Sequence, residues 1–347
     1  MGADSKAQEA SKDKEAVTEP PPAYEAESGP MVKPFPAPLE SCKPPKPAEL
    51  TADQKSKYDA VLKTVSSWET VPTKAGKNAP TEPITDDERM WLTRECLLRY
   101  LRATKWNVSE AQTRLLDTLT WRREYNIKKL TPDYISVENA TGKQIIAGYD
   151  IHGRPCHYLL PSRQNTEKSD RQVEHLVYML ERDIELMGPN QETIALIINF
   201  NETKSGQNAS IAQAKETLNI LQNHYPERLG RALVINVPWV IWGFFKLITP
   251  FIDPLTREKI KFNEDLRKHV PPQQLLNTVG GDVEFKYDHS VYWPTLNAMA
   301  AERREAYRQR WVDGGKLVGE FENYLKGENI PSLAQTQVAN GDGAAST

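Results

Sequence analysis

The spacing of apolar residues predicts a small helical module over residues 50 to 130. Helical stripes occur at Tyr58, Val61, Leu62 and Val65, at Trp91, Leu98 and Leu101, and at Ala111, Leu115 and Leu119. Two capping-box patterns, Thr85 with Glu88 and Ser109 with Gln112, indicate where the second and third helices begin. We therefore expect an all-helical unit in this part of the chain.

From about residue 140 the pattern changes to strands that alternate with helices. Residues 143–149 and 156–160 predict two strands around a turn that contains Gly153 and Pro155. Residues 193–198 and 232–235 are continuous apolar runs, typical of buried strands in a sheet with parallel pairing. Ser169 and Gln172 form a capping pattern before a long amphipathic helix, and another helix separates the two apolar runs. The predicted fold class is α/β.

Both ends of the chain have the composition of disordered segments. Residues 1–48 are rich in Pro, Glu, Lys, Ala and Ser, and residues 336–347 contain the run NGDG. Such segments bury too little apolar surface to offset the entropy lost on ordering. We expect two disordered tails, and a helical extension over residues 291–335 before the second one.

Charge and cysteine content narrow the class of protein. The 347 residues carry 44 Lys and Arg against 47 Asp and Glu, which argues against a general nucleic-acid binder. The three cysteines show no metal or disulfide spacing, and the N-terminus has no signal-peptide pattern. The most apolar stretch, residues 233–252, is interrupted by polar residues and prolines and is not a membrane span. We expect a cytoplasmic protein with at most a peripheral membrane contact.

No catalytic signature is present in the sequence. The motifs GxSxG, GxGxxG and GxxxxGK[ST] are absent, and the six histidines form no metal-binding pattern. Cys156 and Arg163 resemble a phosphatase loop, but one residue too many separates them, so Cys156 is interpreted as a strand residue. We expect no enzyme activity, no metal and no cofactor.

The segment VIWGFFKLITPFI at residues 240–252 is the most unusual stretch of the chain. Its large apolar side chains surround the expected helix instead of forming one stripe. This pattern is typical either of a fully buried core helix or of a lid between an internal apolar cavity and a membrane. Periodicity leaves both interpretations open.

Five ordered motifs resemble the CRAL-TRIO lipid-binding family. They are LLRYLRATKW at 97–106, GRP at 153–155, HYPERLG at 224–230, PFIDPLT at 250–256 and VGG at 279–281. RQNTE at 163–167 and VYWP at 291–294 are similar to fungal phosphatidylinositol transfer proteins of the pleiotropic-drug-resistance subgroup. The resemblance implies a CRAL-TRIO domain over residues 138–290, in which a mixed sheet forms the floor of an apolar lipid pocket gated by a helix.

The resemblance also implies residues for each part of this pocket. The headgroup of phosphatidylinositol would contact Lys105, Glu227, Thr256 and Lys259, with Ile194 and Leu196 on the pocket wall. The gate would comprise Trp242, Phe244, Phe245, Leu247, Ile248 and Phe251. Lysines and a threonine hydroxyl donate to phosphate, and a carboxylate accepts from inositol hydroxyls. An alternative for Glu227 is a local ion pair with Arg228 or Lys259.

Two departures from the family pattern bear on the ligands. Thr104 stands where other members carry Arg beside Lys105, so we expect headgroup affinity to be weaker or shared differently among the site residues. Ile194 and Leu196 stand where phosphatidylcholine carriers have small hydroxyl residues, which predicts poor use of phosphatidylcholine and makes a sterol a second candidate ligand. The alternatives are a sterol carrier, or a regulatory module that presents phosphatidylinositol to a lipid kinase. Transient contact is expected with membranes such as endoplasmic reticulum, lipid droplet or plasma membrane, and none with nucleic acid.

Overall fold

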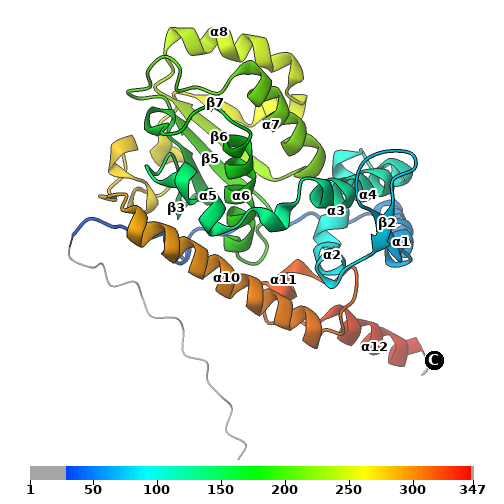
Figure 1. Ribbon diagram of the computed structural model, residues 1–347. Helices are drawn as coiled ribbons and strands as arrows, with labels where there is room; N and C mark the ends of the chain where they lie inside the picture. Colours follow the sequence, from blue (N-terminus) through cyan, green and yellow to red (C-terminus); the bar gives the residue numbers. More distant parts are fainter. Residues whose placement is uncertain (1–28, 345–347) are drawn as a thin grey trace, which may run out of the picture.

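The computed structural model describes residues 29 to 344 (Figure 1). A helical module and a small hairpin come first, followed by a sheet with its covering helices. The module contains α1 (Ala52–Ser66), α2 (Asp86–Trp91), α3 (Arg94–Ala103) and α4 (Val108–Glu124), with a hairpin of β1 (Thr70–Pro72) and β2 (Thr81–Pro83). Its core contains the predicted apolar stripes, including the fully buried Val61, Val65, Leu115 and Leu119.

The predicted helix starts in this module are half correct. Thr85 and Glu88 form a capping box at α2, as the sequence indicates. The predicted cap of α4 at Ser109 and Gln112 was wrong. The N-cap is Asn107, whose side chain accepts a hydrogen bond from the N–H of Glu110 at 3.1 Å. Asparagine caps helices as well as serine does, so the helix begins two residues earlier than predicted.

The second part of the chain contains a mixed sheet of five strands. In spatial order they are β3 (Gln144–Tyr149), β4 (Pro155–Leu159), β5 (Ile194–Asn199), β6 (Leu229–Ile235) and β7 (Ile260–Phe262). β3 and β4 are antiparallel, and the other neighbours pair in parallel. β6 begins three residues before its apolar run, because Leu229 already pairs with Ile194. The α/β class and the mixed sheet are confirmed.

Helices cover the sheet and extend beyond it. They are α5 (Pro132–Asn139), α6 (Arg171–Leu186), α7 (Ile211–His224), α8 (Trp239–Ile248), α9 (Pro254–Glu258), α10 (His289–Asp313), α11 (Glu322–Leu325) and α12 (Leu333–Ala344). The predicted cap at Ser169 and Gln172 was wrong, because Asp170 occupies the N-cap of α6 and makes no side-chain cap bond.

The long helix α10 lies against α6 and the sheet edge (Figure 1). The Tyr292 hydroxyl fixes it there by bonding both the N–H and the carbonyl of Ile146.

The segment from residue 29 to 48 is packed against the second part of the chain. Met31 forms backbone bonds with Glu284 (2.7 Å) and Lys286 (2.9 Å). The carbonyl of Ala37 accepts from the Gln274 side chain at 3.1 Å, and Cys42 is buried. The prediction of a disordered tail was therefore wrong for residues 29–48, because backbone pairing and burial compensate for the composition of this segment. Residues 1–28 of that prediction lie outside the described residues.

The C-terminal prediction also needs a correction. The helix α12 includes residues 336 to 344, which were expected to be disordered. The N–H of Leu333 donates to Glu320 at 2.9 Å, and this bond joins the start of the helix to the preceding loop. Residues 345–347 lie outside the described part of the chain. Within residues 29 to 344, no helix is long and apolar enough to cross a membrane.

Candidate functional site

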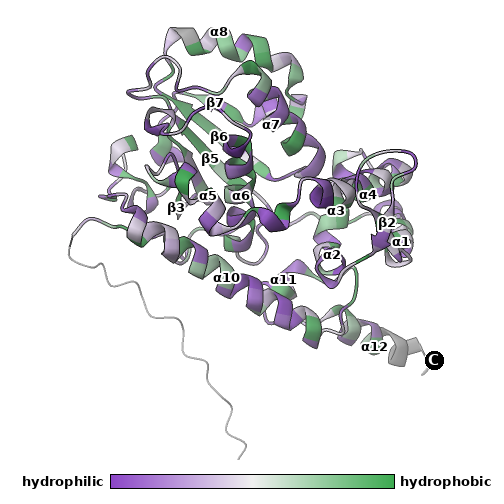
Figure 2. Cartoon of the chain, viewed as in Figure 1, coloured by the Kyte–Doolittle hydropathy of each residue, from purple (hydrophilic) through white to green (hydrophobic). Residues whose placement is uncertain are grey.

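A cavity of about 780 Å³ lies between the sheet, α6, α7 and the α8–α9 segment. Its floor is the sheet, where alternate residues of a strand point to the same face. Ile194, Leu196 and Ile198 on β5 therefore all line it, and Ala195 and Ile197 are buried on the opposite face. Both predicted wall residues, Ile194 and Leu196, are part of this surface. Figure 2 shows the hydrophobic character of the central strands and of α8.

The predicted gate residues divide between the two sides of the segment. Phe244, Phe245 and Ile248 line the cavity. The other three are exposed, by 40% for Trp242, 57% for Leu247 and 47% for Phe251. This division excludes the fully buried core helix that the sequence left open. The segment has one apolar side facing the cavity and another facing solvent.

Trp239, at the start of α8, adds to the outer apolar surface and was not among the predicted gate residues. It is 86% exposed, the largest exposure among the described large hydrophobic residues. Leu255, on α9, is also exposed, by 60%. Several large apolar side chains exposed along the α8–α9 segment are typical of an interaction surface.

The four predicted headgroup residues come from three distant segments and all line the same cavity. They are Lys105 after α3, Glu227 before β6, Thr256 in α9 and Lys259 at its end. Asp253 caps α9 by accepting from the N–H groups of Leu255 (2.9 Å) and Thr256 (3.2 Å), which orients the start of this short helix. The fold thus brings the four side chains to one cavity, and their role in binding remains a prediction.

Two of these residues adopt an unusual backbone conformation. Lys105 has φ of 51° and Glu227 has φ of 60°, both in the left-handed region. This region is costly for residues other than Gly, and such strain is concentrated at functional sites. Seven other non-glycine residues in the described part of the chain also have positive φ, so this conformation alone does not mark Lys105 and Glu227 as functional.

Arg102 is a cation at this site that sequence reasoning missed. It lines the cavity, and its Nε lies 3.8 Å from Oε2 of Glu227. Its Nη2 donates a hydrogen bond to Glu192 Oε2 at 3.1 Å. The alternative pairing of Glu227 with Arg228 or Lys259 was wrong: Arg228 instead donates to the Glu192 carbonyl at 3.0 Å. Arg102 lies within the motif at residues 97–106, but neither this motif nor the helical pattern marked it as a headgroup residue.

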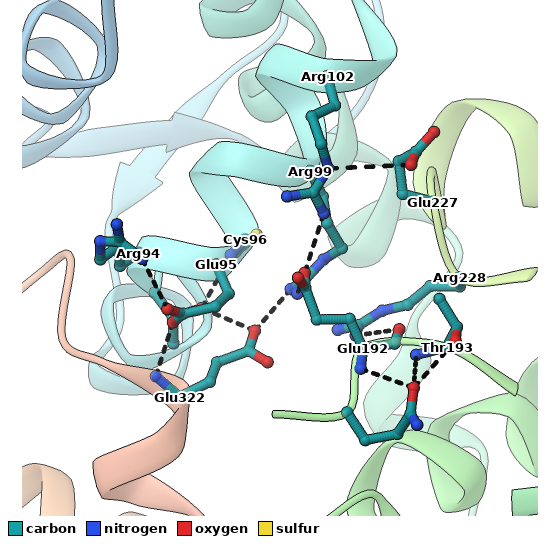
Figure 3. A network of polar contacts seen from close by, with 12 residues as sticks. Arg94, Glu95, Cys96, Arg99, Arg102, Glu192, Thr193, Glu227, Arg228 and Glu322 are labelled. Carbon is teal, nitrogen blue, oxygen red and sulfur yellow. Dashed lines mark hydrogen bonds and ion pairs between the residues drawn. The ribbon is translucent and has the colours of Figure 1, made fainter. Parts of the chain in front are cut away.

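Figure 3 shows the ion-pair network that continues from Arg102 into the protein. The guanidinium of Arg99 is buried and lies 2.7 Å from both Glu192 and Glu322. Burial lowers the pKa of Arg99, but the Glu322 and Glu192 carboxylates outweigh it and raise that pKa well above the usual value. The network therefore joins α3 of the helical module, the loop before β5 and α11.

A second polar feature lies on the sheet floor of the cavity. Gln144 and His157 both line it, although both are almost fully buried. His157 Nδ1 lies 2.6 Å from Asp183 Oδ2, and His157 Nε2 lies 3.1 Å from Gln144 Oε1. No sequence pattern indicated this pair, and His157 was interpreted as an ordinary histidine.

Other candidate chemistry is limited in the described residues. No group of His, Cys, Asp and Glu in residues 29–344 is placed to hold a metal ion. Cys42, Cys96 and Cys156 are buried free thiols, and Cys156 lies in β4 as predicted. Burial raises the pKa of the Cys156 thiol well above its usual value, which makes it a poor nucleophile.

Comparisons with known proteins agree with this architecture. Residues 139–281 match the CRAL/TRIO domain, and residues 57–117 match the CRAL/TRIO N-terminal domain. The crystal structure of Sfh5 has the same fold, with a TM-score of 0.52 and 17% identity, covering 75% of this chain and all of that one.

Two fungal relatives are similar over most of the chain. A CRAL-TRIO domain-containing protein of Schizosaccharomyces pombe is 51% identical over 307 residues, which cover 88% of this chain but 30% of the relative. The phosphatidylinositol transfer protein PDR17 of Saccharomyces cerevisiae is 39% identical over 298 residues, 81% of this chain and 85% of the relative. The chain therefore belongs to the CRAL-TRIO family, with both the helical N-terminal domain and the lipid-binding domain of that family.

Proposed function

We propose that this protein binds phosphatidylinositol in the cavity and transfers it between membranes. The observation that carries the proposal is the composition of one continuous cavity. Its floor and gate are apolar, and it is also lined by Lys105, Glu227, Thr256 and Lys259. A diacyl phospholipid with a polyhydroxylated headgroup has the same division between apolar and polar parts. The similarity to PDR17 supports this choice of lipid.

The energetics favour transfer without chemistry. Two acyl chains contain on the order of 30 methylenes, each worth about 0.8 kcal/mol when buried. Free lipid in water is therefore extremely unfavourable, whereas a bilayer and an apolar cavity are similar environments. Exchange between these two environments runs close to balance, and no bond is made or broken.

The α8–α9 segment acts in this proposal as the gate. Its inner side contributes Phe244, Phe245 and Ile248 to the cavity. Its outer side, with Trp239 and Leu247, enters the interface of a membrane, where tryptophan is especially favourable. Contact with the membrane compensates for opening the gate, so lipid leaves only there. We place this contact on the cytoplasmic faces of membranes such as endoplasmic reticulum, lipid droplet or plasma membrane.

Phosphatidylcholine is expected to be a poor ligand. The wall positions Ile194 and Leu196 carry no hydroxyl group to bond a choline phosphate inside the cavity. An unsatisfied buried polar group costs about 1–3 kcal/mol. A less polar second ligand, such as a sterol, fits these walls better.

Mass spectrometry of the lipids that co-purify with the protein, combined with vesicle transfer assays, tests the proposal. We expect phosphatidylinositol in the purified protein and its transfer between vesicles. Bound phosphatidylinositol without transfer would instead favour a module that presents the lipid to a kinase, and a sterol alone would favour a sterol carrier. A chemically altered lipid would contradict the expectation that the protein is not an enzyme.

A further inference from the structure

One row of residues crosses the cavity floor from the gate side to the far edge of the sheet. Ile260 on β7 pairs with Ala232 on β6, Ala232 with Leu196 on β5, and Leu196 with His157 on β4. All four line the cavity. Three strand spacings of about 4.8 Å separate the ends of the row by roughly 14 Å. The row is apolar until it reaches His157.

The polar end of the row has unused hydrogen-bonding capacity. Gln144 Oε1 lies 3.1 Å from His157 Nε2, and Gln144 Nε2 lies 3.3 Å from His175 Nδ1. A side-chain amide has two N–H donors and two acceptor lone pairs. One donor and one lone pair of Gln144 are therefore spare, whichever way the amide is turned. Gln144 faces an otherwise apolar part of the cavity, where a pure hydrocarbon would leave both unsatisfied.

The charges near this end favour a neutral ligand group. Asp183 is fully buried, and its Oδ2 bonds His157, whereas its Oδ1 is buried without a hydrogen-bond partner. An anionic ligand group near this carboxylate would be repelled. Burial holds the pKa of His175 well below its usual value, so that ring is uncharged. Lys143, before β3, is paired with Glu138. A phosphate or carboxylate would find no free cation among these groups, whereas a hydroxyl both accepts and donates one hydrogen bond.

We propose that Gln144, supported by His157 and Asp183, binds the hydroxyl group of a sterol whose ring system lies along the Leu196–Ala232 floor. The proposal rests on the proposed lipid-carrying function of the same cavity. A sterol has one hydroxyl at the end of a rigid apolar body, which matches one polar position at the end of an apolar row. A rigid body also loses less conformational entropy on binding than an acyl chain.

Competition against the fluorescent sterol dehydroergosterol tests this assignment on the full chain. The competitors are cholesterol and cholestane, which has the same ring system without the hydroxyl. A site built to bond a hydroxyl rejects the analogue that lacks it. We expect cholesterol to compete at least about 10-fold better than cholestane on the wild type, a difference of about 1.4 kcal/mol. Equal competition by the two compounds would overturn the proposal without any variant.

Gln144→Met keeps the length of the side chain and removes the amide. We expect it to reduce the cholesterol-to-cholestane ratio to about 1 while cholestane competition stays unchanged. Gln172→Met is the matched control, because Gln172 also lines the cavity but is bonded to Gln213 on the helical side. The assignment would be contradicted if Gln172→Met also reduced the cholesterol-to-cholestane ratio to about 1. It would also be contradicted if Gln144→Met weakened competition by cholesterol and by cholestane equally. If Gln144→Met does not fold, the wild-type ratio decides alone.

Transfer of phosphatidylinositol, measured on the same preparations, separates this inference from the proposed function. Transfer without any preference for the hydroxylated sterol defeats the inference and leaves the function intact. Preference for the hydroxylated sterol without phosphatidylinositol transfer defeats the function and supports the hydroxyl site.

Discussion

Arg102 and Glu227 face each other across the junction of the helical module and the lipid-binding domain, with Arg102 Nε 3.8 Å from Glu227 Oε2 (Figure 3). The distance is long for a hydrogen bond, so the pair is loosely held. Both side chains also line the cavity. A headgroup placed there offers a phosphate to the guanidinium and hydroxyls to the carboxylate. In the proposed function, the two domains would contribute one partner each to the same end of the ligand.

Glu227→Gly separates function from stability. The left-handed backbone of Glu227, with φ of 60°, costs a non-glycine residue about 1 kcal/mol, which glycine does not incur. We expect the variant to lose most phosphatidylinositol transfer while its melting temperature stays the same or rises. Vesicle transfer and thermal unfolding are the two measurements. A lowered melting temperature would show that Glu227 is mainly structural.

Much of the fold follows from local patterns in the sequence. The i, i+2 alternation of β5 already places Ile194 and Leu196 on one face, and the helical stripes locate α1 and α4. The four predicted headgroup residues are different, because Lys105 and Thr256 are 151 positions apart and no local pattern links them. Only the resemblance to a family predicted that they would meet.

The missed features depend on contacts between distant segments. Arg102 meets Glu227 and Glu192 only after the module docks, so nothing around it in the sequence marks its role. Gln144 and His157 lie on the two strands of a hairpin that the sequence predicted, but their partners Asp183 and His175 come from α6, which no local pattern links to them. The segment around Cys42 has a disordered composition, but its burial is decided by its partners elsewhere in the fold.

Trp239→Asp tests the outer surface of the gate. A charge on α8 at a highly exposed position should leave the fold intact but oppose entry into the membrane interface. We expect vesicle binding and lipid transfer to fall about 10-fold or more, consistent with losing the burial of one large side chain. Val137→Asp, at an exposed position on α5, is the control and should change neither. Equal effects of the two substitutions would contradict the gate assignment.

Glu322→Ala should destabilise the protein strongly. It removes one of two carboxylates from the buried Arg99, and breaking a buried ion pair costs about 3–5 kcal/mol. Chemical denaturation measures the free energy of unfolding. Adding Lys326→Met to Glu322→Ala should recover part of the loss, because the buried Lys326 ammonium, 3.2 Å from Glu322, is the charge left without a carboxylate partner. A double variant less stable than Glu322→Ala alone would argue against this reasoning.

Acid should destabilise the fold through His224. This ring stacks on Trp121, and burial together with Arg114 and Arg122 lowers its pKa to about 4. Between pH 6.5 and about 4 the unfolded chain binds a proton that the folded protein does not, so stability falls as pH falls. His224→Gln should flatten the pH dependence of the free energy of unfolding between pH 6.5 and about 4, and should leave its slope near pH 8 unchanged. An unchanged slope between pH 6.5 and 4 would contradict the assignment to His224.

The transfer of phosphatidylinositol and phosphatidylcholine between vesicles, measured side by side on the same protein, decides whether the cavity carries phosphatidylinositol. We expect rapid transfer of phosphatidylinositol, slow transfer of phosphatidylcholine, and loss of phosphatidylinositol transfer in the Glu227→Ala, Lys259→Ala double variant with near-normal stability. Equal transfer of both lipids by the wild type, or phosphatidylinositol transfer that survives in the double variant, would contradict this expectation.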